Sequence, residues 1–514
     1  MTVPPSIPLR ALAALALLLL AACAAPPPRE PVEPAMPEPE PEPPPREQPF
    51  EFDPDAPAGR IEALRLAIEQ PDFRPTLALG LLLDLPLAEL ESLERRHGRE
   101  SSLVPWLALA RTTRAELLDD AALTVAWSDW QQRFAPDAAD IVPGLLEWTR
   151  RWRQAQPAPS QIAVLLPDRA PLATAGNAVR SGLLEAWLEQ PVARRAGLRF
   201  MDVAEGTDAL AAIDDQGSEL VIGPLGREAV GAALDRVGTD QQRQWLFLNR
   251  PPETFPAIDP TVPAVVLALP PEVEAQAIAE RALARGETRA LMVSEFSDYG
   301  RRVAEAFRQA FEAGGGEIRG EASYSPASFD HTAALARLLE VDRSRARLER
   351  LTSLLGQPVS GEPRPRGDHD LLFVAARGER MRQLMPQLRF LDGLERPVFA
   401  TSDAWPGSES GDDLDGLIVP ISPWMLGDGP AATRRERAIE RFPALAGSSV
   451  LQSLHALGRD ALALAPWIDE MRADPSLALP GELGRWRLVD GVTLAREPVW
   501  AQVRQGRLVP LSEP

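Results

Sequence analysis

Histidine and cysteine, which often bind metals or act in catalysis, are sparse in this sequence. There are four histidines in 514 residues, and they are widely separated: His97, His331, His369 and His455. No HExxH motif and no closely spaced set of His and Cys is present, so the sequence predicts no metal site. His369 stands between Asp368 and Asp370, as a ligand would in a metal cluster. Because a buried strand is expected directly after it, we interpret these three residues as structural.

Two glycine-containing segments match catalytic or phosphate-binding motifs only in part. The segment Gly407-Ser-Glu-Ser-Gly411 has glutamate where a nucleophile elbow requires serine. Gly314-Gly-Gly316 follows a predicted helix, whereas a phosphate-binding loop precedes one. We therefore expect a loop and a helix cap, and we predict no catalytic residue, no cofactor and no enzymatic activity.

Two further segments carry residues that contact ligands or partners in many proteins. Ser297, Asp298 and Tyr299 lie at the end of a predicted strand, where ligands bind in open α/β folds. The simpler alternative is that this segment caps the start of a helix. Arg364 and Arg366 are suited to forked hydrogen bonds with carboxylates or with a partner surface. The alternative for these arginines is solvated charge beside two prolines.

The N-terminus has the pattern of an export signal followed by a lipid attachment site. Arg10 precedes the apolar stretch 11–20, which is too short to span a bilayer comfortably. The following residues, 20–23, read Leu-Ala-Ala-Cys and resemble the bacterial lipobox, so we expect Cys23 to be lipidated after removal of the signal peptide 1–22. Alanines follow Cys23 in place of the aspartate that tends to retain lipoproteins in the inner membrane. This resemblance favours an outer-membrane anchor that leaves the protein on the periplasmic side. Because Cys23 is the only cysteine, no disulfide forms within the chain.

The composition excludes one large class of partners. The formal net charge is −20, the isoelectric point is about 4.9, and all basic residues are arginine. Nucleic acid is excluded as an expected partner because its binding depends on a clustered positive surface. An acidic chain is also repelled by anionic lipid surfaces, so membrane attachment is assigned to the lipid on Cys23.

Two regions precede the main folded part. Residues 23–57 form a Pro/Glu-rich tract, which predicts a semi-rigid linker of polyproline II type. Residues 58–157 show helical periodicity interrupted by Pro, Gly and Asp breakers, which predicts antiparallel helical pairs. This α-helical domain is TPR-like, although the 34-residue repeat signature is faint. Its tryptophans are interpreted as packing residues.

From Gln161 onward, short apolar runs alternate with amphipathic segments. The run 162–166 is typical of a strand in a parallel sheet, and strand and helix patterns then repeat. This α/β pattern predicts a domain over 160–514 with two doubly wound lobes. We expect lobe 1 to comprise about 160–266 and 424–480, and lobe 2 about 267–423 and 481–514. Asp490-Gly491 and Gln505-Gly506 predict two tight hairpins that close a sheet edge.

Several segments of the α/β region resemble, in order and spacing, those of the LpoA (LppC) family of penicillin-binding protein activators. The segments are 162–167 (IAVLLP), 220–225 (LVIGPL), 271–275 (PEVEA), 300–304 (GRRVA) with Ala306 and Phe307, 363–366 (PRPR) with Asp368 and Asp370, 400–402 (ATS), 413–416 (DLDG), 423–424 (PW), and 457–458 (LG) with Asp460 and Ala461. The resemblance spans about 161–510 and implies a two-lobed fold like that of type I periplasmic binding proteins. The lipobox, spacer and helical segment occupy the positions that this family gives them.

One segment departs from the family pattern. After the first strand the sequence reads Pro167-Asp168-Arg169, whereas the family usually carries a small Ser-Gly turn there. In ligand-binding relatives of this fold that turn faces the cleft. The bulky Asp168 and Arg169 argue against a small-molecule ligand, although they remain candidates for cleft or partner contacts.

The resemblance implies an outer-membrane lipoprotein that binds a class A penicillin-binding protein across the periplasm and stimulates its transpeptidase. The residues alone predict an anchor, a spacer, a helical array and a two-lobed domain, which suit a tethered adaptor. The main alternative is a substrate-binding lipoprotein of an amino-acid or amide transporter, because the same fold serves that purpose. A cell-wall hydrolase would need a carboxylate pair or metal site that the sequence does not offer.

Overall fold

The structure of the protein is a computed structural model. It describes residues 57–70, 73–98, 100, 102–117, 119–135, 141–155, 159–190, 192, 195–203, 213, 217–237, 243–407 and 411–511. The predicted signal peptide, Cys23 and nearly all of the Pro/Glu-rich linker lie outside these residues. Within the described part of the chain, no helix combines the length and the apolar character needed to cross a bilayer.

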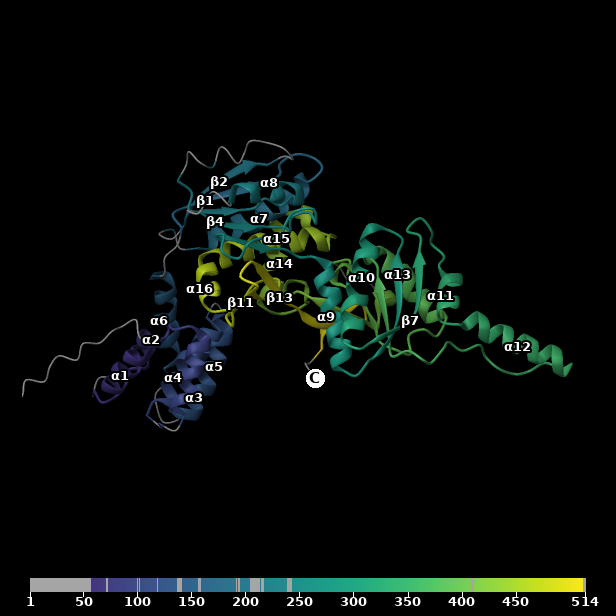
Figure 1. The fold of residues 1–514 in the computed structure, drawn as a ribbon, viewed down its shortest axis with the longest axis horizontal. Coiled ribbons are helices and arrows are strands. Elements are labelled where there is room, and N and C mark those ends of the chain that lie inside the picture. Colours follow the sequence, from purple (N-terminus) through teal and green to yellow (C-terminus); the bar gives the residue numbers. More distant parts are fainter. Residues whose placement is uncertain are drawn as a thin grey trace, which may run out of the picture. The chain divides into compact units, whose positions relative to one another are not determined.

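Six helices form the N-terminal part of the described chain (Figure 1). They are α1 (Pro57–Ile68), α2 (Pro75–Leu82), α3 (Leu87–His97), α4 (Val104–Ala115), α5 (Asp120–Phe134) and α6 (Val142–Ala155). Asp119 caps α5 by accepting hydrogen bonds from the backbone N–H groups of residues 121 and 122 at 2.9 and 3.0 Å. Trp127 and Trp130 are buried between the helices, and the Trp127 indole donates to Thr113 Oγ1 at 2.9 Å. The helical prediction and the packing role of these two tryptophans are confirmed.

An eight-stranded sheet forms the core of lobe 1, in the order β11-β12-β13-β5-β4-β3-β1-β2. Its strands are β1 (Gln161–Leu166), β2 (Gly197–Asp202), β3 (Leu220–Ile222), β4 (Gln244–Phe247), β5 (Ala264–Leu267), β11 (Ala478–Pro480), β12 (Arg485–Val489) and β13 (Thr493–Glu497). Strands β1 to β5 pair in parallel. Residues 162–166, 220–222, 245–247 and 264–267 of these strands are all apolar and buried, as in a parallel sheet that is covered on both faces.

Lobe 2 contains a seven-stranded sheet in the order β15-β14-β10-β9-β8-β6-β7. Its strands are β6 (Arg289–Glu295), β7 (Glu317–Tyr324), β8 (Leu371–Ala375), β9 (Val398–Phe399), β10 (Leu417–Ile421), β14 (Val499–Arg504) and β15 (Arg507–Pro510). The helices of this lobe are α9 (Pro271–Ala284), α10 (Asp298–Ala313), α11 (Thr332–Leu338), α12 (Val341–Leu355) and α13 (Gly378–Phe390). The chain passes between the lobes after β5, after β10 and after β13.

The helices of lobe 1 include a tightly packed pair. They are α7 (Ala173–Glu189), α8 (Arg227–Val237), α14 (Gly429–Arg441), α15 (Ser449–Leu464) and α16 (Ile468–Ala473). Helices α7 and α15 pack together because each has a glycine at the contact (Figure 1). A Cβ on Gly182 would lie 1.8 Å from the His455 carbonyl oxygen, and a Cβ on Gly458 would lie 2.1 Å from that of Val179. Any larger residue at either position would force these helices apart.

The helical N-terminal domain contacts lobe 1 through polar and aromatic side chains. Arg114, only 1% exposed, donates to Glu470 Oε2 at 2.9 Å, and Arg485 donates to Glu116 Oε2 at the same distance. Trp152 stacks on Trp467 of lobe 1 with ring centroids 6.4 Å apart. A buried guanidinium without its partner carboxylate is costly, so the two domains stabilise one another.

One predicted lobe assignment is wrong. Residues 481–498 were expected in lobe 2, but β12 and β13 belong to the sheet of lobe 1, where β13 pairs in parallel with β5. Only β14 and β15 extend lobe 2, because the chain crosses at Pro498. The hairpins themselves are confirmed: Asp490, Gly491, Gln505 and Gly506 all have positive φ, as type I′ turns require. The repeating pattern also predicts a helix over 207–213, which lies outside the described residues apart from residue 213.

Candidate functional site

Three parallel strands of lobe 2 end at the same edge of the sheet, facing the junction with lobe 1. Strands β6, β8 and β9 have their carboxyl ends there, which is where open α/β sheets bind ligands. Helix α9 begins next to this edge, because the chain has just crossed from β5 in lobe 1. Pro271 in its first turn favours the start of a helix at this point. The side chains that these elements bring together define the candidate site.

The centre of the site is an ion pair between the lobes. Glu274 of α9 contacts Arg496 of β13, and both side chains are nearly buried, with exposed fractions of 12% and 10%. Glu274 also accepts hydrogen bonds from the backbone N–H of Ser402 at 2.7 Å and from its hydroxyl at 2.8 Å. Burial raises the pKa of Glu274, while the charge of Arg496 opposes that shift. The ion pair therefore holds α9 and the end of β9 against the sheet of lobe 1.

A second polar group lies beside this ion pair on the lobe 2 side. The Tyr299 hydroxyl is 3.0 Å from Thr401 Oγ1, and both residues are buried. The Arg377 guanidinium lies over the Tyr299 ring, 4.1 Å from its centroid. Burial raises the pKa of Tyr299 and of the neighbouring Asp403. These groups hydrogen-bond or stack with one another, which leaves few polar atoms directed at a ligand.

Two cavities flank the ion pair. One, of about 170 Å³, is lined by Ser402, Asp403, Trp405 and Leu454. The other, of about 280 Å³, is lined by Arg250, Gln276, Asp490 and Thr493. Both are also lined by Glu274 and Arg496. Each is smaller than the 300–1,000 Å³ that is usual for a small-molecule site.

The Asp168–Arg169 turn lies in lobe 1, at the carboxyl ends of β1 and β2. The Asp168 N–H donates to Asp202 Oδ1 at 3.1 Å, and Arg169 Nε lies 3.2 Å from Asp202 Oδ2. The hydrogen bond from the Asp168 N–H is the main cause that lowers the pKa of Asp202, and the positive charge of Arg169 lowers it further. Asp168 and Arg169 line neither cavity and are well exposed, so the structure does not bring them to the ion pair.

The three residues after β6 divide into a cap, a surface residue and a buried residue. Ser297 caps α10 by accepting from the Gly300 N–H at 3.1 Å, as the simpler interpretation expected. Asp298 is exposed and pairs with Arg301 at 3.1 Å. Only Tyr299 reaches the candidate site, through Thr401 and Arg377.

The arginines near the start of β8 also differ in role. Arg366 forms two hydrogen bonds to Asp368, at 2.5 and 2.7 Å, so its forked contact is made within the chain. Arg364 is exposed, and its backbone N–H donates to Ser344 Oγ at 3.1 Å. His369 is buried, with Nδ1 unpaired among the described residues, and burial together with nearby Arg366 lowers its pKa. In the described part of the chain, no group of His, Cys, Asp and Glu is arranged to hold a metal ion.

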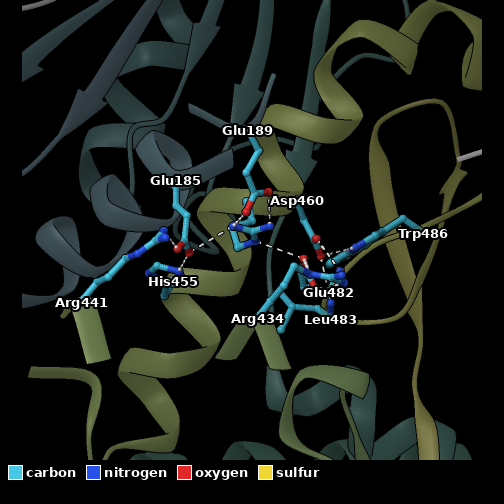
Figure 2. Close-up of polar contacts among 10 residues, drawn as sticks. Glu185, Glu189, Arg434, Arg441, His455, Asp460, Glu482, Leu483 and Trp486 are labelled. Atoms are coloured by element: carbon cyan, nitrogen blue, oxygen red, sulfur yellow. Dashed lines mark hydrogen bonds and ion pairs between the residues drawn. The ribbon is translucent and has the colours of Figure 1, made fainter. Parts of the chain in front are cut away.

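A buried polar network in lobe 1 was not predicted (Figure 2). It includes a Ser–His–Glu arrangement: Ser181 Oγ lies 2.8 Å from His455 Nδ1, and His455 Nε2 lies 3.1 Å from Glu185 Oε2. Burial is the main cause that lowers the pKa of His455. Ser181 lies within α7, is 8% exposed and packs against α15, and it lines neither cavity described above. A buried serine in a helix–helix contact cannot attack a substrate, so this arrangement is structural.

The network continues from α15 toward the ion pair. Arg459 donates to Glu185 at 3.1 Å, to Glu189 at 2.7 Å and to Glu482 at 3.1 Å (Figure 2). Asp460 accepts from the Trp486 indole at 2.8 Å and from two backbone N–H groups, those of residue 482 at 2.6 Å and residue 483 at 3.1 Å. Burial, reinforced by the charge of Glu482, raises the pKa of Asp460 to about 7.

This network positions one side of the ion pair. The N–H of Leu483 is held by Asp460, and its carbonyl oxygen accepts from Arg496 at 3.1 Å. The chain of contacts thus runs from the α7–α15 pair through the β11–β12 loop to Arg496. Sequence reasoning missed this, although Glu274 and Asp460 both stand in segments that carry the family resemblance. The signal that was available is the charged pair Arg459-Asp460 within residues 456–464, a stretch that otherwise contains only Ala, Leu and Gly.

The architecture defines a class of protein: a helical domain followed by a two-lobed domain of the type I periplasmic-binding-protein kind. Residues 82–506 match the family model described as "LppC putative lipoprotein", and the chain belongs to that family. The resemblance stated from the sequence is confirmed.

Known relatives agree with this classification. The chain is 25% identical over 360 residues to a protein from Photobacterium profundum named "Penicillin-binding protein activator LpoA", and the match covers 68% of this chain. It covers 57% of that relative, so the chain matches less than two thirds of the relative's length.

Solved structures show the same fold. Haemophilus influenzae LpoA is 20% identical with a TM-score of 0.54, covering 88% of this chain and 78% of that one. A "putative branched-chain amino acid ABC transporter" from Rhodospirillum rubrum is 16% identical with a TM-score of 0.50, covering 68% of this chain and 100% of that one. Two kinds of protein therefore share this fold, and the choice between them depends on the site.

Proposed function

We propose that this chain is an outer-membrane lipoprotein that binds a class A penicillin-binding protein and stimulates its transpeptidase. Membership of the LppC family supports a regulatory role, and so does the activator name of the relative from Photobacterium profundum. The lipobox at Cys23 supports lipid anchoring, and the alanines after it support the outer membrane.

The observation that carries the choice between regulator and transport receptor is the ion pair at the lobe junction. A receptor of this fold must leave polar groups free in the cleft to orient its solute. Here Glu274 is bonded to Arg496 and to both donors of Ser402. The two cavities beside this ion pair, of about 170 and 280 Å³, are both lined by Glu274 and Arg496, whose charges are already paired with one another. The chain is therefore better suited to present an outer surface to a protein than to enclose a solute.

The proposed domain order also suits an adaptor that reaches across the periplasm. Lipid on Cys23 would attach the chain to one membrane, while class A synthases are anchored in the other. A linker of roughly 35 residues, extended at about 3.1 Å per residue, would span on the order of 100 Å. The helical domain adds further length at about 1.5 Å per residue along its helices. We assign synthase binding to the two-lobed domain, 160–514, which follows these spacers in the chain.

Affinity capture tests the proposed partner. The full chain, purified in detergent, is immobilised and exposed to solubilised envelopes of the same organism, and captured proteins are labelled with a fluorescent β-lactam. We expect retention of a high-molecular-weight, β-lactam-binding synthase that an unrelated acidic lipoprotein does not retain. Failure to retain any β-lactam-binding protein would contradict the proposal.

Calorimetry against free amino acids and small amides tests the alternative. Dissociation constants near 1 μM, equivalent to about 8 kcal/mol, would favour the transport receptor.

A further inference from the structure

Helix α12 has unusually little packing for its length. It contains 15 residues, and Val341 at its start is its only buried residue. In Figure 1 the helix extends beyond the sheet of lobe 2. Isolated helices of about this length are marginally stable in water, and most helices in proteins are stabilised by burying one face. A helix this exposed has a surface available for a further contact.

One side of α12 is braced by the chain that returns toward β8. The Arg364 N–H donates to Ser344 Oγ at 3.1 Å, and the Val359 N–H lies 3.4 Å from Thr352 Oγ1. Between them, Gly361 approaches Leu348 so closely that a Cβ there would lie 2.9 Å from Leu348 Cδ2. Residues 344, 348 and 352 follow the i, i+4, i+8 spacing of one helix face, so the returning segment covers that face.

Another side carries both apolar and positive side chains and is uncovered. Arg347, Arg350, Leu351 and Leu354 have the i, i+3, i+4, i+7 spacing of a single face, which we call the open face. Leu354 is 75% exposed and Leu351 is 46% exposed. Among the described residues, neither arginine of the open face forms an ion pair. Helix α12 carries four arginines and two carboxylates in a chain of net charge −20, so it is locally positive.

We propose that the open face of α12 docks into a groove on the class A synthase that has an apolar floor and a carboxylate rim. This inference rests on the proposed function and names the surface that carries it. Anchors at i, i+3, i+4 and i+7 are the pattern by which amphipathic helices bind grooves. The two leucines fit the apolar floor, and the unpaired arginines fit the carboxylates.

A lipid surface fits these observations less well. Interfacial helices usually insert Trp or Phe beside their leucines, and α12 has no aromatic residue. Its apolar surface is limited to a few leucines near one end. The high negative charge of the whole chain also opposes approach to anionic lipid.

Matched substitutions on the two sides of α12 test the proposal. Leu354→Asp places a charge on the open face, while Ser353→Asp places the same charge on the neighbouring exposed position. Arg350→Glu and Arg345→Glu form a second pair, on and off the open face. The full chain in detergent is titrated against the purified synthase, and thermal unfolding verifies folding. The altered side chains are largely solvent-exposed, so all four variants should fold.

We expect Leu354→Asp to weaken synthase binding by about tenfold or more, as for an anchor residue at an interface. Arg350→Glu should weaken binding and make it less sensitive to salt, whereas the two control variants should stay within about twofold of the parent.

If all four variants bind like the parent, the role of α12 is refuted while the proposed function stands. If the parent itself does not bind, both proposals fail. If the open-face variants lose binding to anionic lipid vesicles but keep their affinity for the synthase, the helix contacts membrane instead.

Discussion

The ion pair between Glu274 and Arg496 at the lobe junction allows the free-energy cost of a substitution to be predicted. Replacing Glu274 with glutamine keeps the side-chain volume but removes the charge opposite Arg496, whose side chain is only 10% exposed. Arg496 would then lose its carboxylate partner and would be left with neutral acceptors such as the Leu483 carbonyl oxygen. Removing one partner of a buried ion pair typically costs about 3–5 kcal/mol. Because the glutamine amide oxygen can still accept from Ser402, we expect the lower end, about 3 kcal/mol.

Hydrogen exchange provides a local measurement of this effect. The backbone N–H of Ser402 donates to Glu274, so the exchange rate of a peptide covering 400–405 reports opening of the junction. A loss of about 3 kcal/mol corresponds to exchange roughly a hundredfold faster. Asp298→Asn is a suitable control, because Asp298 and Arg301 are 84% and 72% exposed and such surface pairs contribute about 1 kcal/mol or less.

A double-mutant cycle separates the ion pair from general disruption. Arg496→Met removes the other charge, and the double variant Glu274→Gln with Arg496→Met leaves no unpaired charge at the junction. The double variant should therefore be more stable than the sum of the single effects implies, by about 2 kcal/mol. Exchange at 400–405 that is unchanged in Glu274→Gln, or effects that are strictly additive, would refute the interlobe ion pair as a stabilising contact.

Three further predictions concern the anchor, a buried histidine and the lobe 1 network. Cys23→Ala prevents acylation, so the protein should leave the outer-membrane fraction, and unchanged fractionation would remove the lipoprotein assignment. The folded-state pKa of His369 is lowered, chiefly by burial, so the unfolded chain takes up a proton first as pH falls below about 6.5, and stability should decline there. Urea midpoints at pH 7.5 and 5.5 should differ less in His369→Gln than in the parent; equal differences would exclude this histidine as a cause. Asp460→Ala leaves three buried N–H donors without their acceptor, which should cost about 3 kcal/mol or more by urea denaturation, and a loss below about 1 kcal/mol would contradict the network.

Local signals in the sequence were sufficient for many elements of the fold. Asp119 marks the start of α5 because an aspartate at this position caps backbone N–H groups. Asp490-Gly491 marks a hairpin because both residues accept positive φ. The buried strand expected after His369 is confirmed as β8, whose five residues are all apolar and all buried.

Other elements depend on contacts that the sequence pattern does not encode. Strand β5 has only four residues in a proline-rich stretch, and α13 contains Pro386, which normally interrupts a helix. Burial of Met381, Leu384 and Leu388 outweighs that local penalty. The lobe assignment of β12 and β13 was wrong because the β12–β13 hairpin signal does not say which sheet the hairpin joins.

The candidate site was the hardest part to predict. Glu274 and Arg496 are separated by 222 residues and come from different lobes, so no spacing rule connects them. Of the seven residues proposed from the sequence as cleft or partner contacts, only Tyr299 lies at the junction. The predicted end of a strand before Ser297 indicated the correct edge of the sheet, but it did not indicate which side chains form the site at that edge.

The central claim is that this chain activates a class A penicillin-binding protein, and reconstituted peptidoglycan synthesis tests it most directly. The purified synthase is supplied with lipid-linked precursor, and the fraction of cross-linked peptides is measured without additions, with the full chain, with residues 160–514, and with residues 58–157. The account predicts that the full chain and residues 160–514 raise cross-linking, whereas residues 58–157 do not. Cross-linking that stays at the level of the synthase alone in the presence of the full chain would contradict the proposed function, and stimulation by residues 58–157 alone would contradict its assignment to the two-lobed domain.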